Sequence, residues 1–200
     1  MAKIARAFYL NTDVVQVAQG LLGKVLFTHF NDELTAGVIV ETEAYCGATD
    51  KACHAYPNKR TKRTETMYQV GGTAYVYLIY GMHAMFNVVT NEAETADAVL
   101  VRAIEPVQGL EIMKKRRNLK TPGTNLTAGP AMLAKALGIT TAHDKTDLLG
   151  ECIWLEEGDK VYGSDEIVAS TRVGIDYAEE DALLPWRFRV KDNKWCSKAK

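Results

Sequence analysis

The sequence predicts an α+β fold: a single domain with a curved, largely antiparallel sheet, flanking helices and a protruding β-hairpin. Two observations support this prediction. Short apolar runs occur in pairs joined by turn residues, which is typical of β-hairpins, and the helical segments between them do not form regular strand–helix–strand repeats. The chain has 200 residues and is 47% hydrophobic, which suffices to bury one core, so residues 1–200 are expected to form one domain.

The N-terminal part of the chain predicts a helix followed by a hairpin. Apolar residues recur at helical spacing over residues 14–22, and Asn11 or Thr12 is the expected N-cap. Two apolar runs follow at residues 24–28 and 36–44. Asn and Asp lie between these runs and favour a turn, so the two strands are expected to pair as a hairpin.

A second hairpin follows a long polar segment. Residues 46–70 are small, polar and basic, which indicates a functional loop that leads into a short helix. Strand character returns at residues 73–79 and 83–90, and Tyr80-Gly81-Met82 joins the two strands. We therefore expect a hairpin with an aromatic side chain at its tip.

The second half of the chain mixes helices with short strands. A strand is predicted at residues 98–104. A helix is expected to begin near Pro106, with Glu105 at its N-terminal end, and to end in the basic run 114–117. Another helix is expected at residues 130–138, where Gly-Pro begins it and Gly ends it. The remaining strands are predicted at residues 152–155, 166–170 and 187–190.

The charge balance excludes a strongly basic protein. The formal net charge is −1 at pH 7, so any contact with nucleic acid must be local. Two basic clusters could supply phosphate contacts, although such clusters are more often solvated surfaces. They consist of Lys59, Arg60, Lys62 and Arg63, and of Lys114, Lys115, Arg116 and Arg117.

No metal site is expected, and no membrane contact. The four cysteines show no C-x-x-C spacing, which argues against both a zinc site and a disulfide framework, and the histidines lack the spacing of metal ligands. The N-terminus lacks the apolar core of a signal peptide, and no run approaches the roughly 20 apolar residues of a membrane span. We therefore expect a cytoplasmic protein.

Two carboxylates and an arginine are the first candidates for chemistry. Strand alternation places Glu41, Glu43 and Tyr45 on one face. This face could be solvated, as strand carboxylates usually are, or it could line a site. Arg102 lies in an otherwise apolar strand, where a buried guanidinium would need an acceptor, and Glu43 is a natural partner. Arg102 could equally face solvent from an edge strand.

Tyrosines and one histidine form a second group of candidates. Three tyrosines occur within residues 75–80. They could simply pack in a sheet, or they could form a stacking surface and a wedge for nucleobases. His54 lies in the polar loop, where it could be a capping, a solvent-exposed or a pocket residue.

These candidates occur in a characteristic order along the chain. The ordered set is Val40-Glu41-Thr42-Glu43-Ala44-Tyr45, His54, Tyr75 to Met82, Asn87 and Arg102. It resembles the alkyladenine (3-methyladenine) DNA glycosylase family, of the single-domain alkylpurine glycosylase type. The resemblance runs from Phe8 to Trp195 and includes Leu21 to Leu26, Arg102 to Pro106, Ala128 to Pro130 and Arg172 to Gly174. The chain departs from the family in lacking an extended N-terminal tail and in carrying Thr64 where an Asn is often found.

The resemblance implies a monofunctional DNA glycosylase, which hydrolyses the N-glycosidic bond and leaves an abasic site. The implied substrate is duplex DNA that carries an alkylated or deaminated purine: 3-methyladenine, 7-methylguanine, hypoxanthine or ethenoadenine. Glu43 would be the general base for the attacking water, Arg102 would help to hold this water, and the Val173 carbonyl would be a further acceptor. Glu41 is left as structural. No lysine matches a Schiff-base role, so no strand cleavage is expected.

The resemblance also implies a pocket for an extruded base. The base would lie between Tyr45 and Tyr77, with His54 close to its edge. Asn87 would disfavour guanine by crowding its exocyclic amine, and Tyr80 would fill the gap left in the duplex. The protein is expected to act as a monomer without cofactor or metal, in the cytoplasm and at the nucleoid if it is bacterial.

Two other functions stay open. A catalytically inert module could keep the aromatic hairpin and bind damaged DNA or RNA, although the intact Glu43 and Arg102 argue against it. A formyl-transfer accessory domain is suggested by fold analogy with a related open barrel, but the chain carries no formyl-donor motif.

Overall fold

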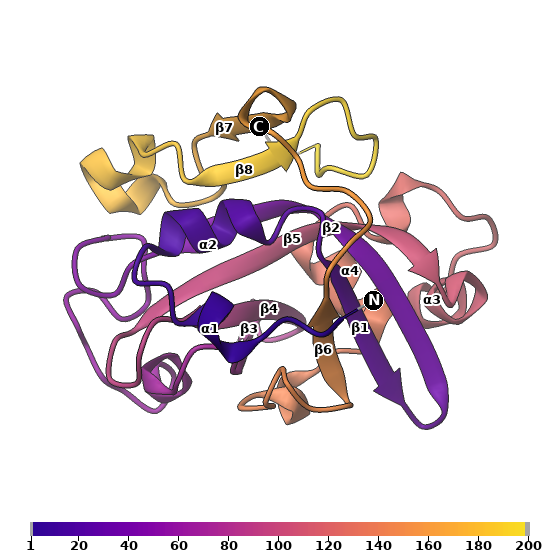
Figure 1. Ribbon diagram of the computed structural model, residues 1–200, viewed down its shortest axis with the longest axis horizontal. Helices are drawn as coiled ribbons and strands as arrows, with labels where there is room; N and C mark the ends of the chain where they lie inside the picture. Colours follow the sequence, from indigo (N-terminus) through magenta and orange to yellow (C-terminus); the bar gives the residue numbers. More distant parts are fainter. Residues whose placement is uncertain (1, 199–200) are drawn as a thin grey trace.

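An eight-stranded sheet organises the protein, whose computed structural model describes residues 2–198 (Figure 1). Six strands follow one another in the order β3-β4-β5-β2-β1-β6, β8 pairs with β2, and β7 pairs with β8. Every pairing between these strands is antiparallel, which confirms the predicted α+β class. The strands are β1 (Val25–Phe30), β2 (Glu33–Tyr45), β3 (Ala74–Ile79), β4 (His83–Thr90), β5 (Asp97–Gln108), β6 (Ile153–Glu156), β7 (Ile167–Ser170) and β8 (Arg187–Val190).

Strand β2 is the centre of the sheet. Along one edge it pairs with β5, and along the other it pairs first with β1 and then, over residues 41–43, with β8. The predicted β1–β2 hairpin is confirmed. Its turn residues Asn31 and Asp32 both have positive φ, which suits the primed turns that join twisted antiparallel strands. Irregular pairing with β5 on both sides of Glu41 marks a bulge in the segment that carries both candidate carboxylates.

The first helices differ in part from the sequence prediction. Helix α2 (Val14–Gly20) is confirmed, but its N-cap is Asp13, whose carboxylate accepts the backbone N–H groups of Val15 and Gln16. The predicted caps Asn11 and Thr12 are therefore wrong; the Asn11 side chain instead accepts the N–H of Asp13. The short helix α1 (Arg6–Tyr9) has no counterpart in the prediction, because four residues carry little periodicity.

The prediction of a helix from Pro106 is also wrong. Strand β5 continues to Gln108, with Pro106 opposite Gly37 of β2, and helix α3 (Leu110–Arg117) begins only after Gly109 in a left-handed conformation. Pairing with β2 outweighs the local signal of a proline at a helix start. The Glu105 carboxylate accordingly contacts Asn193 rather than a helix N-terminus. The basic end of the helix is as predicted.

The remaining elements follow the prediction closely. Helix α4 (Pro130–Leu137) ends at Gly138, which adopts the left-handed conformation of a C-cap. The loop over residues 46–70 ends in a single 3-10 turn, η1 (Glu65–Tyr68). The other 3-10 segments are η2 (Thr124–Leu126), η3 (Thr141–His143), η4 (Ser164–Glu166) and η5 (Asp176–Leu183).

Helix α2 lies against the long central strands β2 and β5, and helix α4 lies against β4 and β5 (Figure 1). On the α2 side, the Thr42 hydroxyl of β2 donates to the carbonyl of Ala18. The side chains of Glu41 and Glu43 alternate with Thr42 and therefore project from the opposite face of the strand. Within residues 2–198, no helix has the length and apolar character needed to cross a membrane.

Candidate active site

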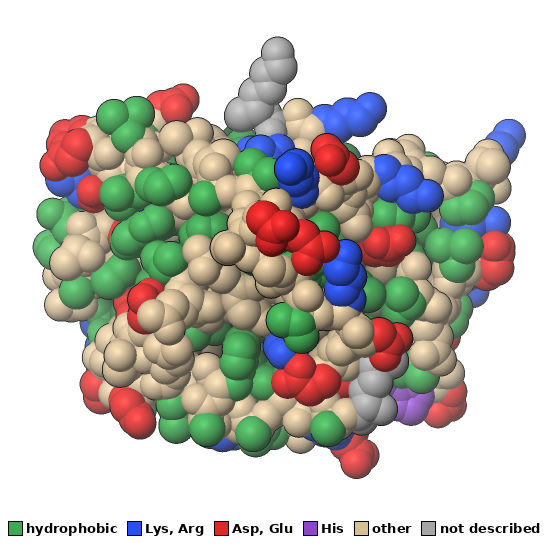
Figure 2. Space-filling view, turned by 45° about the horizontal axis from the view of Figure 1, so that its top comes forward, with side chains coloured by type: hydrophobic (Ala, Val, Ile, Leu, Met, Phe, Trp, Pro, Cys, Tyr) green, Lys and Arg blue, Asp and Glu red, His purple; other side chains and the backbone are tan. Residues whose placement is uncertain are grey.

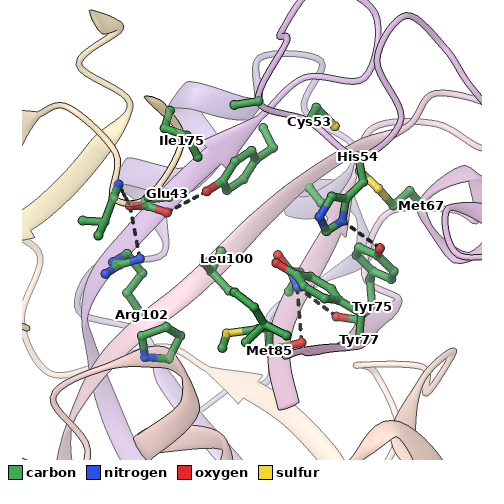
Figure 3. Close-up of a pocket in the computed structure, with 18 of the residues that line it drawn as sticks. Glu43, Cys53, His54, Met67, Tyr75, Tyr77, Met85, Leu100, Arg102 and Ile175 are labelled. Carbon is green, nitrogen blue, oxygen red and sulfur yellow. Dashed lines mark hydrogen bonds and ion pairs between the residues drawn. The ribbon is translucent and has the colours of Figure 1, made fainter. Parts of the chain in front are cut away.

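A cavity of about 360 Å³ opens on this opposite face of the central strands. Its walls come from β2, β3, β4 and β5, from the polar loop after β2, and from the loop before η5 (Figure 3). Every residue predicted for the site lines it, although these residues are scattered over the sequence from residue 43 to residue 173. They are Glu43, Tyr45, His54, Tyr77, Tyr80, Asn87, Arg102 and Val173.

Glu43 is fully buried from solvent and lines one end of the cavity. The Tyr45 hydroxyl donates to its Oε2 at 2.7 Å, the Val173 N–H donates to its Oε1 at 2.9 Å, and Nη1 of Arg102 lies 3.2 Å from the same Oε1. Burial and the neighbouring charge of Glu43 raise the pKa of the Tyr45 phenol, which therefore keeps its proton and donates. The reading of this strand face as solvated is wrong.

Arg102 is buried on β5, between β4 and β2. The edge-strand reading is therefore wrong. Its Nε donates to Oε1 of Glu41 at 2.8 Å, while Nη1 forms the contact with Glu43. Burial opposes the charge on Arg102, but the two carboxylates outweigh it and raise the pKa of the guanidinium. The predicted partner Glu43 is thus one of two, and the shorter contact is to Glu41.

Val173 has a contact that the resemblance did not imply. The predicted role of its carbonyl as an acceptor stays a prediction, and its N–H donates to Glu43. The preceding residue, Arg172, fixes this loop: its guanidinium lies 2.5 and 2.8 Å from the two oxygens of Asp50 and donates to the Ala44 carbonyl at 2.9 Å. Sequence reasoning gave Arg172 no role, because its partner Asp50 lies 122 positions away and no spacing pattern links them.

The opposite end of the cavity is aromatic (Figure 3). His54 packs edge-on against Tyr77, with ring centroids 4.6 Å apart. Nε2 of His54 lies 3.1 Å from Nη2 of Arg63, and Nδ1 lies 3.1 Å from the Tyr75 hydroxyl. Because a guanidinium can only donate, Nε2 must accept, so the proton of a neutral His54 ring is on Nδ1 and points to Tyr75.

Asn87 is a buried residue of β4 beside these rings. Its amide nitrogen donates to the backbone carbonyls of Tyr75 at 3.1 Å and Met85 at 3.4 Å. Both amide hydrogens are therefore used within the protein, and the group that Asn87 can offer to a ligand is its carbonyl oxygen.

Tyr80 lies at the tip of the β3–β4 hairpin, as predicted, and is 84% exposed. An aromatic ring this exposed contributes little packing energy to the fold. The backbone of Tyr80 also has a positive φ, which non-glycine residues rarely adopt. Tyr177 of η5 also lines the cavity and is exposed, and sequence reasoning gave it no role. Two exposed tyrosines thus contribute to the rim of the cavity.

Many of the predicted phosphate-binding side chains already have partners within the protein. Arg60 forms ion pairs with Glu65 and Glu94, and Arg116 with Glu33. On the face drawn in Figure 2, acidic and basic side chains are interspersed, in line with the small net charge. Among residues 2–198, no cluster of three or more His, Cys, Asp or Glu side chains is suited to a metal ion.

His54 should make the stability of the protein depend on pH. Burial, together with the charge of Arg63, lowers the pKa of His54 from 6.5 to about 4. Between these values the unfolded chain binds a proton that the folded chain does not, so the free energy of unfolding falls as the pH falls through this window. His54→Gln is expected to flatten that part of the curve in urea unfolding experiments. His83→Gln, at an exposed position, is the control, and equal slopes for wild type and His54→Gln would contradict the assignment.

Sequence comparisons place the chain within a known family. The family described as methylpurine-DNA glycosylase matches residues 7–194. A relative from Clostridium perfringens (strain 13) is 46% identical over 204 aligned residues, covering 98% of this chain and 99% of its own. One from Clostridium tetani is 47% identical with the same coverage, and one from Chlamydia felis is 45% identical over 96% of this chain and 97% of its own. Each is named "Putative 3-methyladenine DNA glycosylase". The chain belongs to the methylpurine-DNA glycosylase family and is a DNA glycosylase.

Proposed function

We propose that this protein excises 3-methyladenine from duplex DNA by hydrolysis of the N-glycosidic bond, and that 7-methylguanine, hypoxanthine and ethenoadenine are further substrates. The observation that carries the proposal is the buried carboxylate of Glu43 at one end of a cavity whose other end is aromatic. A base inside the double helix cannot reach such a cavity, so the nucleotide must rotate out of the stack. The names of the three relatives support the choice of 3-methyladenine.

Glu43 is the proposed general base. A carboxylate has about four lone-pair positions, and three are taken by Tyr45, Val173 and Arg102. The remaining position, on Oε2, can accept a hydrogen bond from water. As the N-glycosidic bond breaks, the electron pair of the bond leaves with the purine, and positive charge grows on the sugar. The oxygen of the water then bonds to C1′, and a proton of this water passes to Glu43. The carboxylate also stabilises the growing positive charge.

The extruded base is proposed to lie between Tyr45, which contacts Glu43, and Tyr77 at the aromatic end. The Arg172 guanidinium lies 4.8 Å from the centre of the Tyr45 ring, so this ring is already held by a cation–π contact. The neutral His54 adds no positive charge against a cationic alkylated purine. The Asn87 carbonyl oxygen would line the wall where guanine carries its exocyclic amine, and crowding there is the proposed reason for rejecting normal guanine.

The substrate and product of a single turnover test this function. Purified protein is incubated with duplex DNA that contains one modified purine, with and without EDTA, and the free base and the DNA are analysed separately. We expect release of the free base and an abasic site, a strand that stays intact until it is treated with alkali, and no effect of EDTA. Tight binding to an abasic analogue without any base release would instead favour the inert binding module. Since one chain supplies every group of the cavity, the proposal needs only a monomer, which would act in the cytoplasm and, in a bacterium, at the nucleoid.

Tyr80→Ala is expected to slow base release from duplex DNA by about tenfold or more. The variant lacks the ring that would offset the cost, a few kcal/mol, of unstacking the extruded base. The melting temperature should not change, since the side chain is 84% exposed. The same variant should act on single-stranded DNA at the wild-type rate, because no gap has to be filled there. An equal loss on both substrates would contradict the role of Tyr80 as a wedge.

A further inference from the structure

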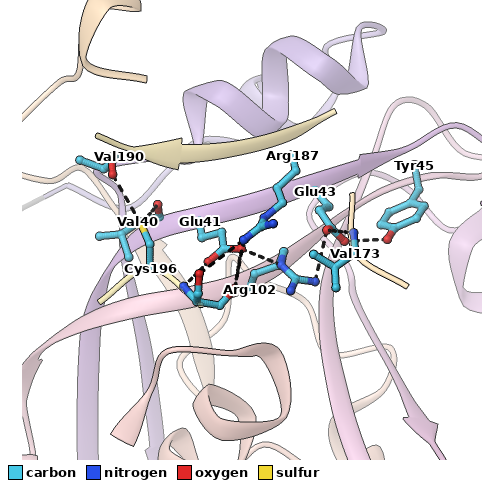
Figure 4. Close-up of polar contacts among 10 residues, drawn as sticks. Val40, Glu41, Glu43, Tyr45, Arg102, Val173, Arg187, Val190 and Cys196 are labelled. Carbon is cyan, nitrogen blue, oxygen red and sulfur yellow. Dashed lines mark hydrogen bonds and ion pairs between the residues drawn. The ribbon is translucent and has the colours of Figure 1, made fainter. Parts of the chain in front are cut away.

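Glu41 lies two residues before Glu43, is also fully buried, and is not part of the cavity wall. Four donors from three segments contact it: Nε of Arg102 at 2.8 Å, Nε of Arg187 at 2.8 Å, and both the N–H and the hydroxyl of Ser197 at 2.6 and 2.9 Å (Figure 4). Three of these donors converge on Oε1, and the Ser197 N–H contacts Oε2. Because Glu41 is enclosed by these donors and does not line the cavity, it does not meet a water held there and cannot substitute for Glu43 as a base.

The Arg102 guanidinium joins the two carboxylates. It is planar and rigid, so a contact made by Nε sets the direction of the other nitrogens. Glu41 binds Nε, and Nη1 then lies 3.2 Å from Glu43 (Figure 4). Burial alone would raise the pKa of Glu41, but Arg102, the Ser197 N–H and Arg187 outweigh it and lower this pKa, so Glu41 stays charged.

The balance of charges also indicates that Glu41 holds Arg102 in place. Glu41, Glu43, Arg102 and Arg187 form a buried group of two negative and two positive charges. Arg187 also lies opposite Glu43 in the β2–β8 pairing. Without the charge of Glu41, Glu43 would be the one carboxylate of this group left to balance the two guanidinium charges, and Arg102 would turn to it as its remaining carboxylate partner.

The segment after β8 completes this group. The Ser197 hydroxyl lies 3.3 Å from Nη2 of Arg187, so Ser197 connects Arg187 and Glu41. The same segment is fixed by Asn193, which donates to Glu105, and by Cys196, whose Sγ lies 3.4 Å from the Val40 carbonyl. None of these three residues of the segment lines the cavity.

We propose that Glu41, together with Arg187 and Ser197, positions Arg102 and Glu43 for the attack of water, so that a segment outside the cavity sets the rate of base release. Glu41 is thus a positioning residue rather than only a structural one. The proposal rests on the proposed glycosylase function. Its test therefore begins with wild-type protein: if wild type releases no base, the function itself fails, and only with an active wild type do the variants bear on Glu41.

The test compares two quantities for each variant, the single-turnover rate of base release and the affinity for duplex DNA with an abasic analogue. Coupling energies within a contacting network correspond to a few-fold to about 100-fold in rate. We expect Glu41→Gln to lower the rate by about tenfold or more, Ser197→Ala to lower it several-fold, and both to bind the abasic analogue like wild type. Glu105→Gln, which contacts the same segment but not Arg102, is the matched control and should keep the wild-type rate.

A double variant separates positioning from a general effect on the fold. If Glu41 acts through Arg102 and Glu43, then Glu41→Gln should cause little further loss in a protein that already carries Glu43→Gln. An equal loss with and without Glu43→Gln, or a parallel loss of rate and affinity, would overturn the proposal. If Glu41→Gln does not fold, Ser197→Ala decides alone, since it removes one of four donors to Glu41; an unchanged rate in that variant would overturn the proposal as well.

Discussion

Glu43→Gln is expected to lower the single-turnover rate of base release by about 100-fold or more, the range supplied by a well-placed general base. The substitution keeps the shape of the side chain and an oxygen for the donors that surround it, but removes the charge and the basic lone pair. The rate is measured with enzyme in excess over duplex DNA that carries one modified purine, so that product release does not limit it.

The control for Glu43→Gln is a measurement of its affinity for DNA. The variant should bind an abasic analogue in duplex DNA as tightly as wild type, because the aromatic cavity wall and Tyr80 are unchanged. A rate within about tenfold of wild type would contradict the assignment of Glu43 as the base. A parallel loss of affinity would show that the substitution acts on the fold rather than on the chemical step.

Arg172→Met is expected to destabilise the protein by about 3–5 kcal/mol, because it leaves the fully buried carboxylate of Asp50 without its partner. For a chain of this length that corresponds to a fall in melting temperature of about 6–20 °C, measured by calorimetry or by circular dichroism. The variant also loses the contact to the Ala44 carbonyl, which holds the loop that carries the Val173 N–H against Glu43. Base release at low temperature should therefore fall as well.

Lys51→Ala provides the control for Arg172→Met. Lys51 lies next to Asp50 in the sequence and pairs with Glu179 and Glu180 of η5, so it connects the same two segments. These ion pairs are exposed, and exposed pairs contribute little to stability. The melting temperature of Lys51→Ala should stay close to that of wild type. If Arg172→Met behaved in the same way, the buried pair would not be what holds the loop.

The sequence predicted the parts of the fold that depend on local patterns. Paired apolar runs and the turn residues between them identified both hairpins, and Gly-Pro and Gly marked the ends of α4. The prediction failed where distant strands decide the structure. Pro106 continues a strand because β2 pairs with it, although locally it resembles a helix start. Glu105 contacts Asn193 for the same reason.

The candidate site shows the same limit. Patterning identified Glu41 and Glu43 as neighbours on one strand face but could not separate them, and only the resemblance favoured Glu43. The structure separates them by their surroundings: Glu43 lines the cavity, whereas Glu41 is enclosed by donors that lie 61 to 156 positions further along the chain. Arg172 and Ser197 were missed because their contacts span similar separations and leave no periodic signal.

The most direct test of the account is a crystal structure of the Glu43→Gln variant bound to duplex DNA with one hypoxanthine, a neutral base that does not leave spontaneously. We predict the base between Tyr45 and Tyr77, the Tyr80 ring in the gap of the duplex, and a water between the substituted side chain at position 43 and C1′, within about 3–3.5 Å of that carbon. A base that remains stacked in the duplex, or an extruded base whose C1′ faces away from position 43, would contradict the assignment of this cavity as the place of base release.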